Sequence, residues 1–256
     1  MKERAQQASN QSSKTEAFTG EDVFQKQADL WWQPDGPFWP LHKMNKLRQQ
    51  YIIDHIINTN GTANNLKPLQ GLRVLDIGCG GGILAEAMAH HGARVTAIDM
   101  ADASLAVARL HRLESKLDID YQKVSAEKFA ERHPQQFDVV TCLELLEHVP
   151  VPASVVDACY RLLKPGGIVF FSTINRNPKS YLFAILGAEY LLKLLPCGTH
   201  DFAKFIKPSE LALWSRNCGL QLQGQVGLHY NPLSKKYSLQ GGLDVNYLAH
   251  YLRPET

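Results

Sequence analysis

Several features that would assign the chain to a common protein class are absent. No apolar run is long enough to span a bilayer, and the polar start from Met1 to Thr19 does not resemble a secretory signal. The five cysteines are scattered without a C-x-x-C pair, which argues against a disulfide framework or a zinc site and fits a reducing compartment such as the cytoplasm. The net charge is only +2, so composition gives no electrostatic case for binding nucleic acid.

Also missing is the third glycine of the dinucleotide-binding fingerprint. The letters V-L-D-I-G-C-G-G-G-I-L-A-E at 74–86 predict a buried strand, a glycine turn and a helix. Gly78 and Gly80 fit the pattern G-x-G-x-x-G, but Ile83 occupies its last position, which disfavours a nicotinamide cofactor. Glycines still let backbone N–H groups approach a ligand closely, so we expect a ligand at this turn.

A second predicted strand, 94–98, narrows the choice of ligand. It is followed by Asp99, about 20 residues after the first glycine, where an acid accepts hydrogen bonds from ribose hydroxyls. This spacing suits an adenosine without a pyrophosphate, and the alternative is a tight turn in an unrelated α/β protein. The stretch resembles motif I of the class I S-adenosylmethionine methyltransferases, which implies that Asp76 lies near the methionine part. In that fold the adenine amino group is met near Ala126, although the neighbouring Glu127 could equally stabilise a helix start.

An acidic cluster follows the next hydrophobic strand, 137–142. Glu144, Glu147 and His148 lie within one turn after it, at the edge of the sheet where open α/β proteins bind ligands. Two carboxylates and an imidazole can hold a hard cation such as Mg²⁺, or a carboxylate can fix the tautomer of a catalytic histidine base. The alternative is a solvated helix face capped by His148. Leu143 would form a wall of the adenine or methyl site.

The N-terminal part divides into a polar lead and a helical cap. Residues 1–20 have few large apolar side chains and predict disorder, whereas 21–256 predict one domain that opens with a helical cap over 21–60. Arg48 would lie on a helix in front of the glycine turn, where its guanidinium can pair with a carboxylate through two hydrogen bonds. The alternative is a solvated surface arginine.

The stretch 175–208 is longer than a compact α/β connection requires. Its centre, 181–195, is strongly apolar but carries Glu189 and Lys193 at i,i+4 spacing. With basic residues around it, this stretch fits an interfacial helix or a lid over an apolar substrate, and a core helix is the alternative. We therefore expect a membrane or lid insertion over 175–208.

From Leu41 to Tyr247 the sequence resembles the ubiquinone biosynthesis O-methyltransferase family. The motifs that carry the resemblance are N-K-L-R at 45–48, the glycine turn, E-L-L-E-H-V at 144–149, S-T-I-N-R-N at 172–177, G-T-H-D at 198–201, F-I-K-P at 205–208 and G-L-H-Y-N-P at 227–232. The last four are not general methyltransferase motifs, which makes the resemblance specific.

The resemblance implies a Rossmann-like α/β fold, with a mostly parallel seven-stranded sheet and helices on both faces. It implies contacts to S-adenosyl-L-methionine at Arg48, Gly78, Asp99 and Leu143. It also implies methylation of polyprenylated phenols and catechols, namely 2-polyprenyl-6-hydroxyphenol and 3-demethylubiquinol, at two steps of the pathway.

In eukaryotic relatives the E-x-x-E-H residues ligate Mg²⁺, which maps onto Glu144, Glu147 and His148. Methyl transfer from a sulfonium is an in-line displacement, so the protein must align the phenol, and a metal or His148 would take its proton. Expected partners are the prenylated substrate, anionic lipid on the inner face of the cytoplasmic membrane, and other quinone-biosynthesis enzymes. The rival hypotheses are methylation of another small phenol, a nicotinamide reductase, and a non-catalytic membrane-associated subunit.

Overall fold

The protein is described by a computed structural model that covers residues 30–33, 35–36, 38–60, 67–181, 201–231, 233–234 and 236–255. The predicted disordered lead at 1–20 lies outside these residues. So does nearly all of the apolar stretch 181–195, and the expected helical cap is described only from residue 30 onward.

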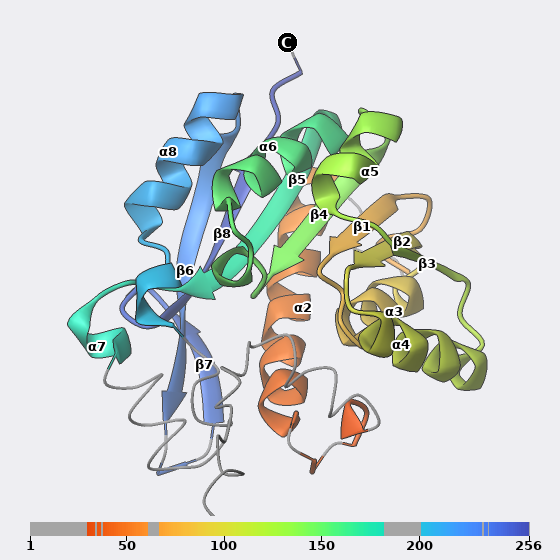
Figure 1. The fold of residues 1–256 in the computed structure, drawn as a ribbon, viewed down its shortest axis with the longest axis horizontal. Coiled ribbons are helices and arrows are strands. Elements are labelled where there is room, and N and C mark those ends of the chain that lie inside the picture. Colours follow the sequence, from red (N-terminus) through yellow and green to blue (C-terminus); the bar gives the residue numbers. More distant parts are fainter. Residues whose placement is uncertain are drawn as a thin grey trace, which may run out of the picture.

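One sheet of eight strands organises the fold, in the order β3-β2-β1-β4-β5-β8-β6-β7 (Figure 1). The strands that pair in parallel are β1 (Arg73–Ile77), β2 (Arg94–Asp99), β3 (Ile119–Lys123), β4 (Phe137–Leu143) and β5 (Leu163–Ile174). The antiparallel part consists of β6 (Gln221–Asn231), β7 (Lys236–Gln240) and β8 (Asn246–Leu252). The predicted α/β class with a mostly parallel sheet is confirmed.

The predicted number of seven strands is wrong by one. Strand β7 forms a hairpin with the end of β6, from Gly227 paired with Gln240 to Asn231 paired with Lys236. This hairpin extends the sheet beyond β6. Its register places Tyr230 opposite Tyr237, and the two rings lie 4.8 Å apart, so aromatic packing across the strands supports the extra strand.

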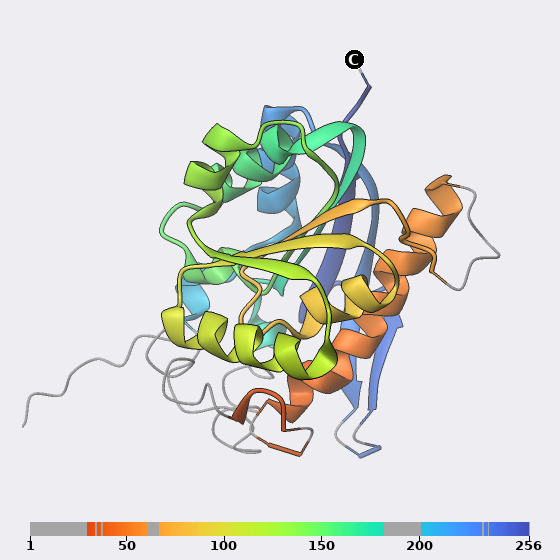
Figure 2. The same cartoon turned by 90° about the vertical axis from the view of Figure 1, so that its right-hand side faces the viewer.

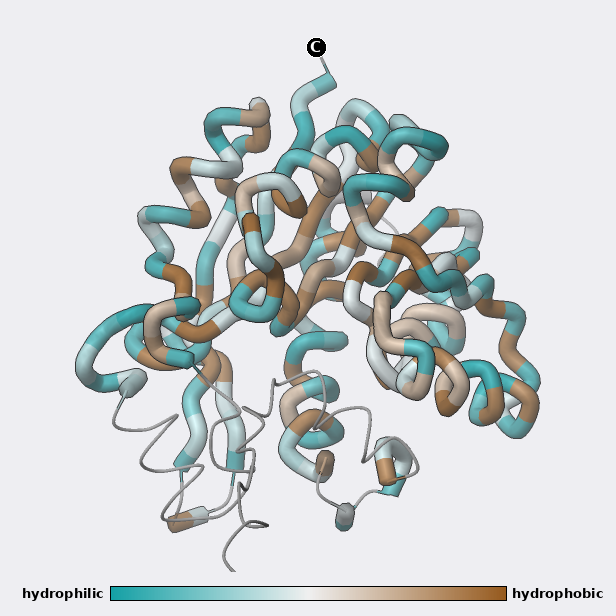
Figure 3. The backbone as a smooth tube through the Cα atoms, in the orientation of Figure 1, coloured by the Kyte–Doolittle hydropathy of each residue, from teal (hydrophilic) through white to brown (hydrophobic). Residues whose placement is uncertain are grey.

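Helices cover both faces of the sheet, as predicted (Figure 2). On one face, α5 (Ala126–Arg132), α6 (Pro152–Leu162) and α8 (Pro208–Cys218) bury apolar side chains in one hydrophobic cluster. On the other, α2 (Trp39–Asn60), α3 (Ile83–His90) and α4 (Asp102–Ser115) form a second cluster. Strand β4 at the centre of the sheet is apolar along most of its length (Figure 3) and largely buried, as expected for a strand covered on both faces.

The two described ends of the 175–208 insertion lie together at the end of β5. The N–H of Ile206 donates to the carbonyl of Ile174 at 2.9 Å, and the rings of Tyr181 and Phe202 lie 5.3 Å apart. The short helices α7 (Pro178–Ser180) and η4 (Phe202–Lys204) flank the gap. The chain therefore leaves and rejoins the sheet at one place, which is the carboxyl end of a central strand.

No helix among the described residues has the length and apolar character needed to cross a membrane.

A buried polar contact joins α2 to the sheet. The hydroxyl of Tyr51 lies 2.9 Å from Nδ1 of His250, a residue of β8, and the ring of His55 lies 4.4 Å from the ring of His250. Burial, together with the nearby His55, lowers the pKa of His250 from 6.5 to about 4. This imidazole is therefore neutral at neutral pH.

We expect acid to destabilise the protein partly through His250. Its pKa is lower in the folded chain, so its contribution to stability is complete above pH 6.5 and is lost as the pH falls toward about 4. Between pH 7 and pH 5 the free energy of unfolding in urea should fall less in a His250→Gln variant than in the wild type. A Tyr51→Phe control, which loses the hydrogen bond but keeps the buried imidazole, should retain the wild-type slope. The same pH dependence in His250→Gln and wild type would contradict this assignment.

Candidate active site

The glycine turn lies between β1 and α3, as the sequence predicts. Gly78, Gly80 and Gly82 have φ angles of 74°, 52° and 89°, a region that side chains with a Cβ rarely adopt. The N–H groups of Gly78 and Cys79 donate to the carbonyl of Ile98 at 2.8 and 3.1 Å. The turn is therefore anchored on β2, and its remaining backbone groups lie at the carboxyl edge of the parallel strands.

Asp99, the last residue of β2, supports the turn from the inner side. Its Oδ2 accepts a hydrogen bond from the N–H of Gly80 and its Oδ1 accepts one from the N–H of Ala101, both at 2.8 Å. Each carboxylate oxygen has two lone pairs, so both oxygens can accept a further hydrogen bond. This geometry fits the predicted role of Asp99 as the acceptor of ribose hydroxyls.

Asp76 lies inside the sheet, in β1, with 3% of its surface exposed. The hydroxyl of Thr141 donates to its Oδ1 at 2.7 Å. Burial, with a smaller contribution from Asp99, raises the pKa of Asp76 to about 7. A cationic ligand group beside this carboxyl would favour its charged form, which fits the predicted position near the methionine part of the cofactor.

Arg48 of α2 is 3% exposed, so the alternative of a solvated surface arginine is wrong. Its Nη2 donates to Oε1 of Glu144 at 2.5 Å. The predicted bidentate pairing with a carboxylate is replaced here by a single hydrogen bond to an acid of the same chain. Its Nε is buried without a hydrogen-bond partner among the described residues, which leaves one donor for a ligand carboxylate.

Glu144 connects three strands at this edge. It follows β4 directly, with a φ of 51°, and its Oε1 accepts a hydrogen bond from the hydroxyl of Ser172 in β5 at 2.8 Å. The amide of Asn246, at the start of β8, donates to the same carboxylate at 3.2 Å. With Arg48, these donors bring three hydrogen-bonding side chains to one carboxylate.

Glu147 and His148, both in the short helix η2 (Leu146–His148), have different surroundings. Glu147 is 4% exposed and accepts a hydrogen bond from the hydroxyl of Thr173 at 2.8 Å, whereas His148 is exposed. Burial, followed by the nearby Glu144, raises the pKa of Glu147 to about 8. The protonated form of Glu147 is therefore favoured near neutral pH.

These three residues do not have the arrangement that Mg²⁺ requires. Within the part of the chain that the structure describes, no group of three or more His, Cys, Asp or Glu residues is placed to hold a metal ion. Glu144 is paired with Arg48, and Glu147 is buried and accepts a hydrogen bond from Thr173, so both carboxylates already have partners within the chain. The donor set does not fit the predicted metal.

The remaining predicted cofactor residues lie at the same edge of the sheet. Leu143 ends β4 and is partly buried, directly before Glu144. Ala126 begins α5 and is 5% exposed, after Ser125, whose hydroxyl caps the helix. Glu127 accepts a hydrogen bond from Ser154 at 2.7 Å, in line with the alternative that it stabilises local structure.

Sequence reasoning missed the polar partners of these acids and an aromatic group beside them. Thr141, Ser172 and Asn246 look like ordinary strand residues in the sequence, and no local pattern pairs them with a distant acid. Tyr237 of the hairpin lies close enough to Arg48 and Glu144 to interact electrostatically with both side chains. Burial raises the pKa of Tyr237 to about 12. The G-L-H-Y-N-P motif, which begins in the first strand of the hairpin, was the available signal.

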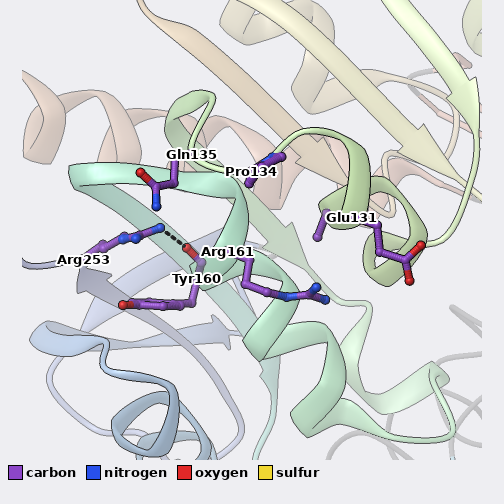
Figure 4. Close-up of a pocket in the computed structure, with 7 residues that line it drawn as sticks. Glu131, Pro134, Gln135, Tyr160, Arg161 and Arg253 are labelled. Carbon is purple, nitrogen blue, oxygen red and sulfur yellow. Dashed lines mark hydrogen bonds between the residues drawn. The ribbon is translucent and has the colours of Figure 1, made fainter.

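A cavity of about 370 Å³ lies elsewhere, between the ends of α5 and α6 and the start of the C-terminal tail (Figure 4). Arg253 lines it, stacks on the ring of Tyr160 and donates to the carbonyls of Tyr160 and Leu163. No residue of the glycine turn and none of the predicted acids lines this cavity. It is therefore not part of the candidate active site.

Comparison with known proteins identifies the class of protein to which this site belongs. A family profile described as a methyltransferase domain matches residues 44–225. Magnesium protoporphyrin IX methyltransferase from Synechocystis PCC 6803 with bound S-adenosylmethionine shares the fold, with a TM-score of 0.57 and 15% identity over 93% of this chain and 99% of that chain. The fold and the glycine-turn site together define an S-adenosylmethionine-dependent methyltransferase.

Closer relatives give the particular family. Ubiquinone biosynthesis O-methyltransferase of Pseudomonas entomophila (strain L48) is 57% identical over 91% of this chain and 95% of its own length. The protein with the same name from Stutzerimonas stutzeri (strain A1501) is 58% identical over 90% of this chain and 94% of its own length. The chain therefore belongs to the ubiquinone biosynthesis O-methyltransferase family, as the sequence motifs predicted.

Replacing Asp99 by Ala should weaken binding of the product S-adenosylhomocysteine. Loss of a charged acceptor for the ribose corresponds to about 1–3 kcal/mol in binding free energy, measurable by isothermal titration calorimetry. Asp102, three residues further on, is exposed and pairs with Lys123, so Asp102→Ala is the matched control and should bind as the wild type does. Wild-type affinity in Asp99→Ala would contradict the role of Asp99.

Proposed function

We propose that this protein transfers the methyl group of S-adenosylmethionine to a hydroxyl of polyprenylated phenols and catechols, at two steps of ubiquinone biosynthesis. The observation that carries the proposal is the identity of 57% over 91% of the chain to ubiquinone biosynthesis O-methyltransferases. Acidic residues at the edge of the sheet beside the glycine turn support it, since that is where a substrate must meet the cofactor. An O-methyltransferase of another small phenol is the second candidate.

The cofactor, when bound, supplies an activated methyl group. The glycine turn and Asp99 bind its nucleoside, and Asp76 and the free Nε of Arg48 suit its cationic and carboxylate groups. The chain then has to hold the phenol oxygen in line with the methyl group and exclude competing orientations, which supplies much of the rate. We expect Leu143, the residue before Glu144, and Tyr237, which interacts electrostatically with Glu144, to border the bound substrate.

His148 is the proposed base for the phenol proton. It is exposed in η2, directly after the buried Glu147, so a substrate approaching the edge of the sheet can reach a ring nitrogen. Positioned histidines contribute about 10²–10⁴-fold in such proton transfers. Because the acids beside it do not fit Mg²⁺, this mechanism assigns no step to a metal.

The direct test is turnover on both substrate types. The purified protein should transfer labelled methyl groups to a short-chain 2-polyprenyl-6-hydroxyphenol and to a short-chain 3-demethylubiquinol. Activity on a simple catechol with equal kcat/KM would favour the second candidate. Absence of turnover on all three, with intact cofactor binding, would favour a non-catalytic subunit that associates with other enzymes of the quinone pathway.

Replacing His148 by Ala should lower kcat by about 100-fold or more, with little change in affinity for S-adenosylhomocysteine, because the imidazole acts on the phenol. His133→Ala, at the end of α5, is the matched control and should retain activity. EDTA should leave the wild type active. Activity that disappears with EDTA and returns with Mg²⁺ would support a metal at Glu144, Glu147 and His148, and full activity of His148→Ala would exclude the base.

The insertion 175–208 supplies the proposed contact with the membrane. A polyprenyl tail partitions into the bilayer, while no described helix can cross it. The insertion leaves and rejoins the fold at the carboxyl end of β5, on the side of the sheet where Ser172 contacts Glu144. An amphipathic helix there would bring the active site to anionic lipid on the inner face of the cytoplasmic membrane, with each basic residue contributing about 1 kcal/mol.

A Leu182→Glu, Leu186→Glu variant should lose binding to anionic liposomes in flotation, and wild-type binding should weaken as salt is added. Both positions lie outside the described residues, so the prediction rests on the sequence of the stretch. Activity on a tail-less substrate serves as the control for folding and should be retained. Equal flotation of the two proteins would show that the stretch is a lid or a core helix.

A further inference from the structure

Two tryptophans from the N-terminal segment pack on the outer side of the glycine turn. The ring of Trp31 lies so close that a Cβ added at Gly80 would come within 2.5 Å of it, and one at Gly81 within 2.2 Å. Gly81 does not have a left-handed φ, so its own backbone does not demand a glycine. The absence of a side chain at Gly81 is instead required by the packing of Trp31.

Trp32 is bound to the turn by a directed contact. Its Nε1 donates to the carbonyl of Gly81 at 2.8 Å, and its ring stacks on that of His111 in α4, with centroids 3.4 Å apart and parallel planes. Nδ1 of His111 in turn lies 2.8 Å from the carboxylate of Glu86, which is 3% exposed. Since Glu86 belongs to α3, these contacts lead from the turn through Trp32 back to the helix that follows the turn.

The glycine turn needs such support because glycine loses more conformational entropy on ordering than any other residue. Asp99 and Ile98 fix the turn from the inner side only, through its backbone N–H groups. We propose that Trp31 and Trp32 form a clamp that holds the turn from the outer side in the conformation that binds the cofactor. Trp32 is then a positioning residue, because it acts on the cofactor through the backbone of Gly81 and need not touch it.

The clamp also couples the packing of the N-terminal segment to cofactor binding at the glycine turn. Nε2 of His42 lies 2.9 Å from the carbonyl of Trp31, and the rings of Trp31 and Phe38 are 4.4 Å apart, so the clamp is attached to the start of α2. Arg48 lies further along the same helix. Because coupling between two sites is reciprocal, cofactor binding should in turn strengthen the packing of the clamp.

The test is the Trp32→Phe variant, which keeps a ring to stack on His111 and removes the N–H donor. Affinity for S-adenosylhomocysteine, measured by calorimetry, should fall about fivefold, the effect of one neutral hydrogen bond. The KM for S-adenosylmethionine should rise by a similar factor, while kcat at saturating cofactor stays close to the wild-type value. Trp32→Ala should weaken binding further, and if it fails to fold, Trp32→Phe alone carries the test.

Trp214→Phe is the matched control, because this tryptophan lies in α8, on the other face of the sheet, and should leave cofactor affinity unchanged. In that background, addition of S-adenosylhomocysteine should change the fluorescence of the remaining tryptophans, and the change should shrink in the Trp32→Phe, Trp214→Phe double variant. A purely structural Trp32 would lower the melting temperature of the variant and leave the cofactor KM unaltered. That outcome, or wild-type affinity in Trp32→Phe, would overturn the proposal.

Discussion

The ion pair between Arg48 and Glu144 determines how the edge of the sheet is built. Arg48 is 3% exposed, and a buried guanidinium without a partner would cost several kcal/mol, so α2 has to lie where Arg48 can reach an acid. Glu144 meets this need from the end of β4, and its carboxylate also accepts hydrogen bonds from Ser172 and Asn246. One carboxylate thereby links the cap helix to strands β4, β5 and β8, which the backbone hydrogen bonds of the sheet already hold in register.

The same ion pair lies beside a second acid. Burial raises the pKa of Glu147 to about 8, and the nearby Glu144 adds to this rise. A divalent metal at this place would need Glu147 to lose its proton and Glu144 to leave Arg48. Arg48 instead pairs with Glu144 within the chain. This pairing explains why an acidic cluster that resembles a metal motif in sequence is not arranged as a metal site.

Much of the central fold could be predicted from sequence because its signals are local. The strand, glycine turn and helix at 74–86 and the position of Asp99 follow from hydrophobic pattern and spacing, and the structure places them at one edge as expected. The strand β7 and the pairing of Arg48 with Glu144, which are 96 residues apart, could not be predicted because both depend on tertiary packing. For the same reason, the partners of Asp76 and Glu147 were missed.

In the N-terminal segment, residue type alone could not predict where the two tryptophans lie in the fold. Two adjacent tryptophans before a helix indicate burial, but this signal is compatible with many positions in the fold. Their actual position depends on Gly80 and Gly81 having no side chains and on the ring of His111 at the far side. The glycines therefore meet two requirements at once: the positive φ angles of Gly78, Gly80 and Gly82 form the turn, and the missing Cβ atoms of Gly80 and Gly81 admit Trp31. Segment and turn must then form together, which makes the cap helix part of the cofactor site and not merely a cover for it.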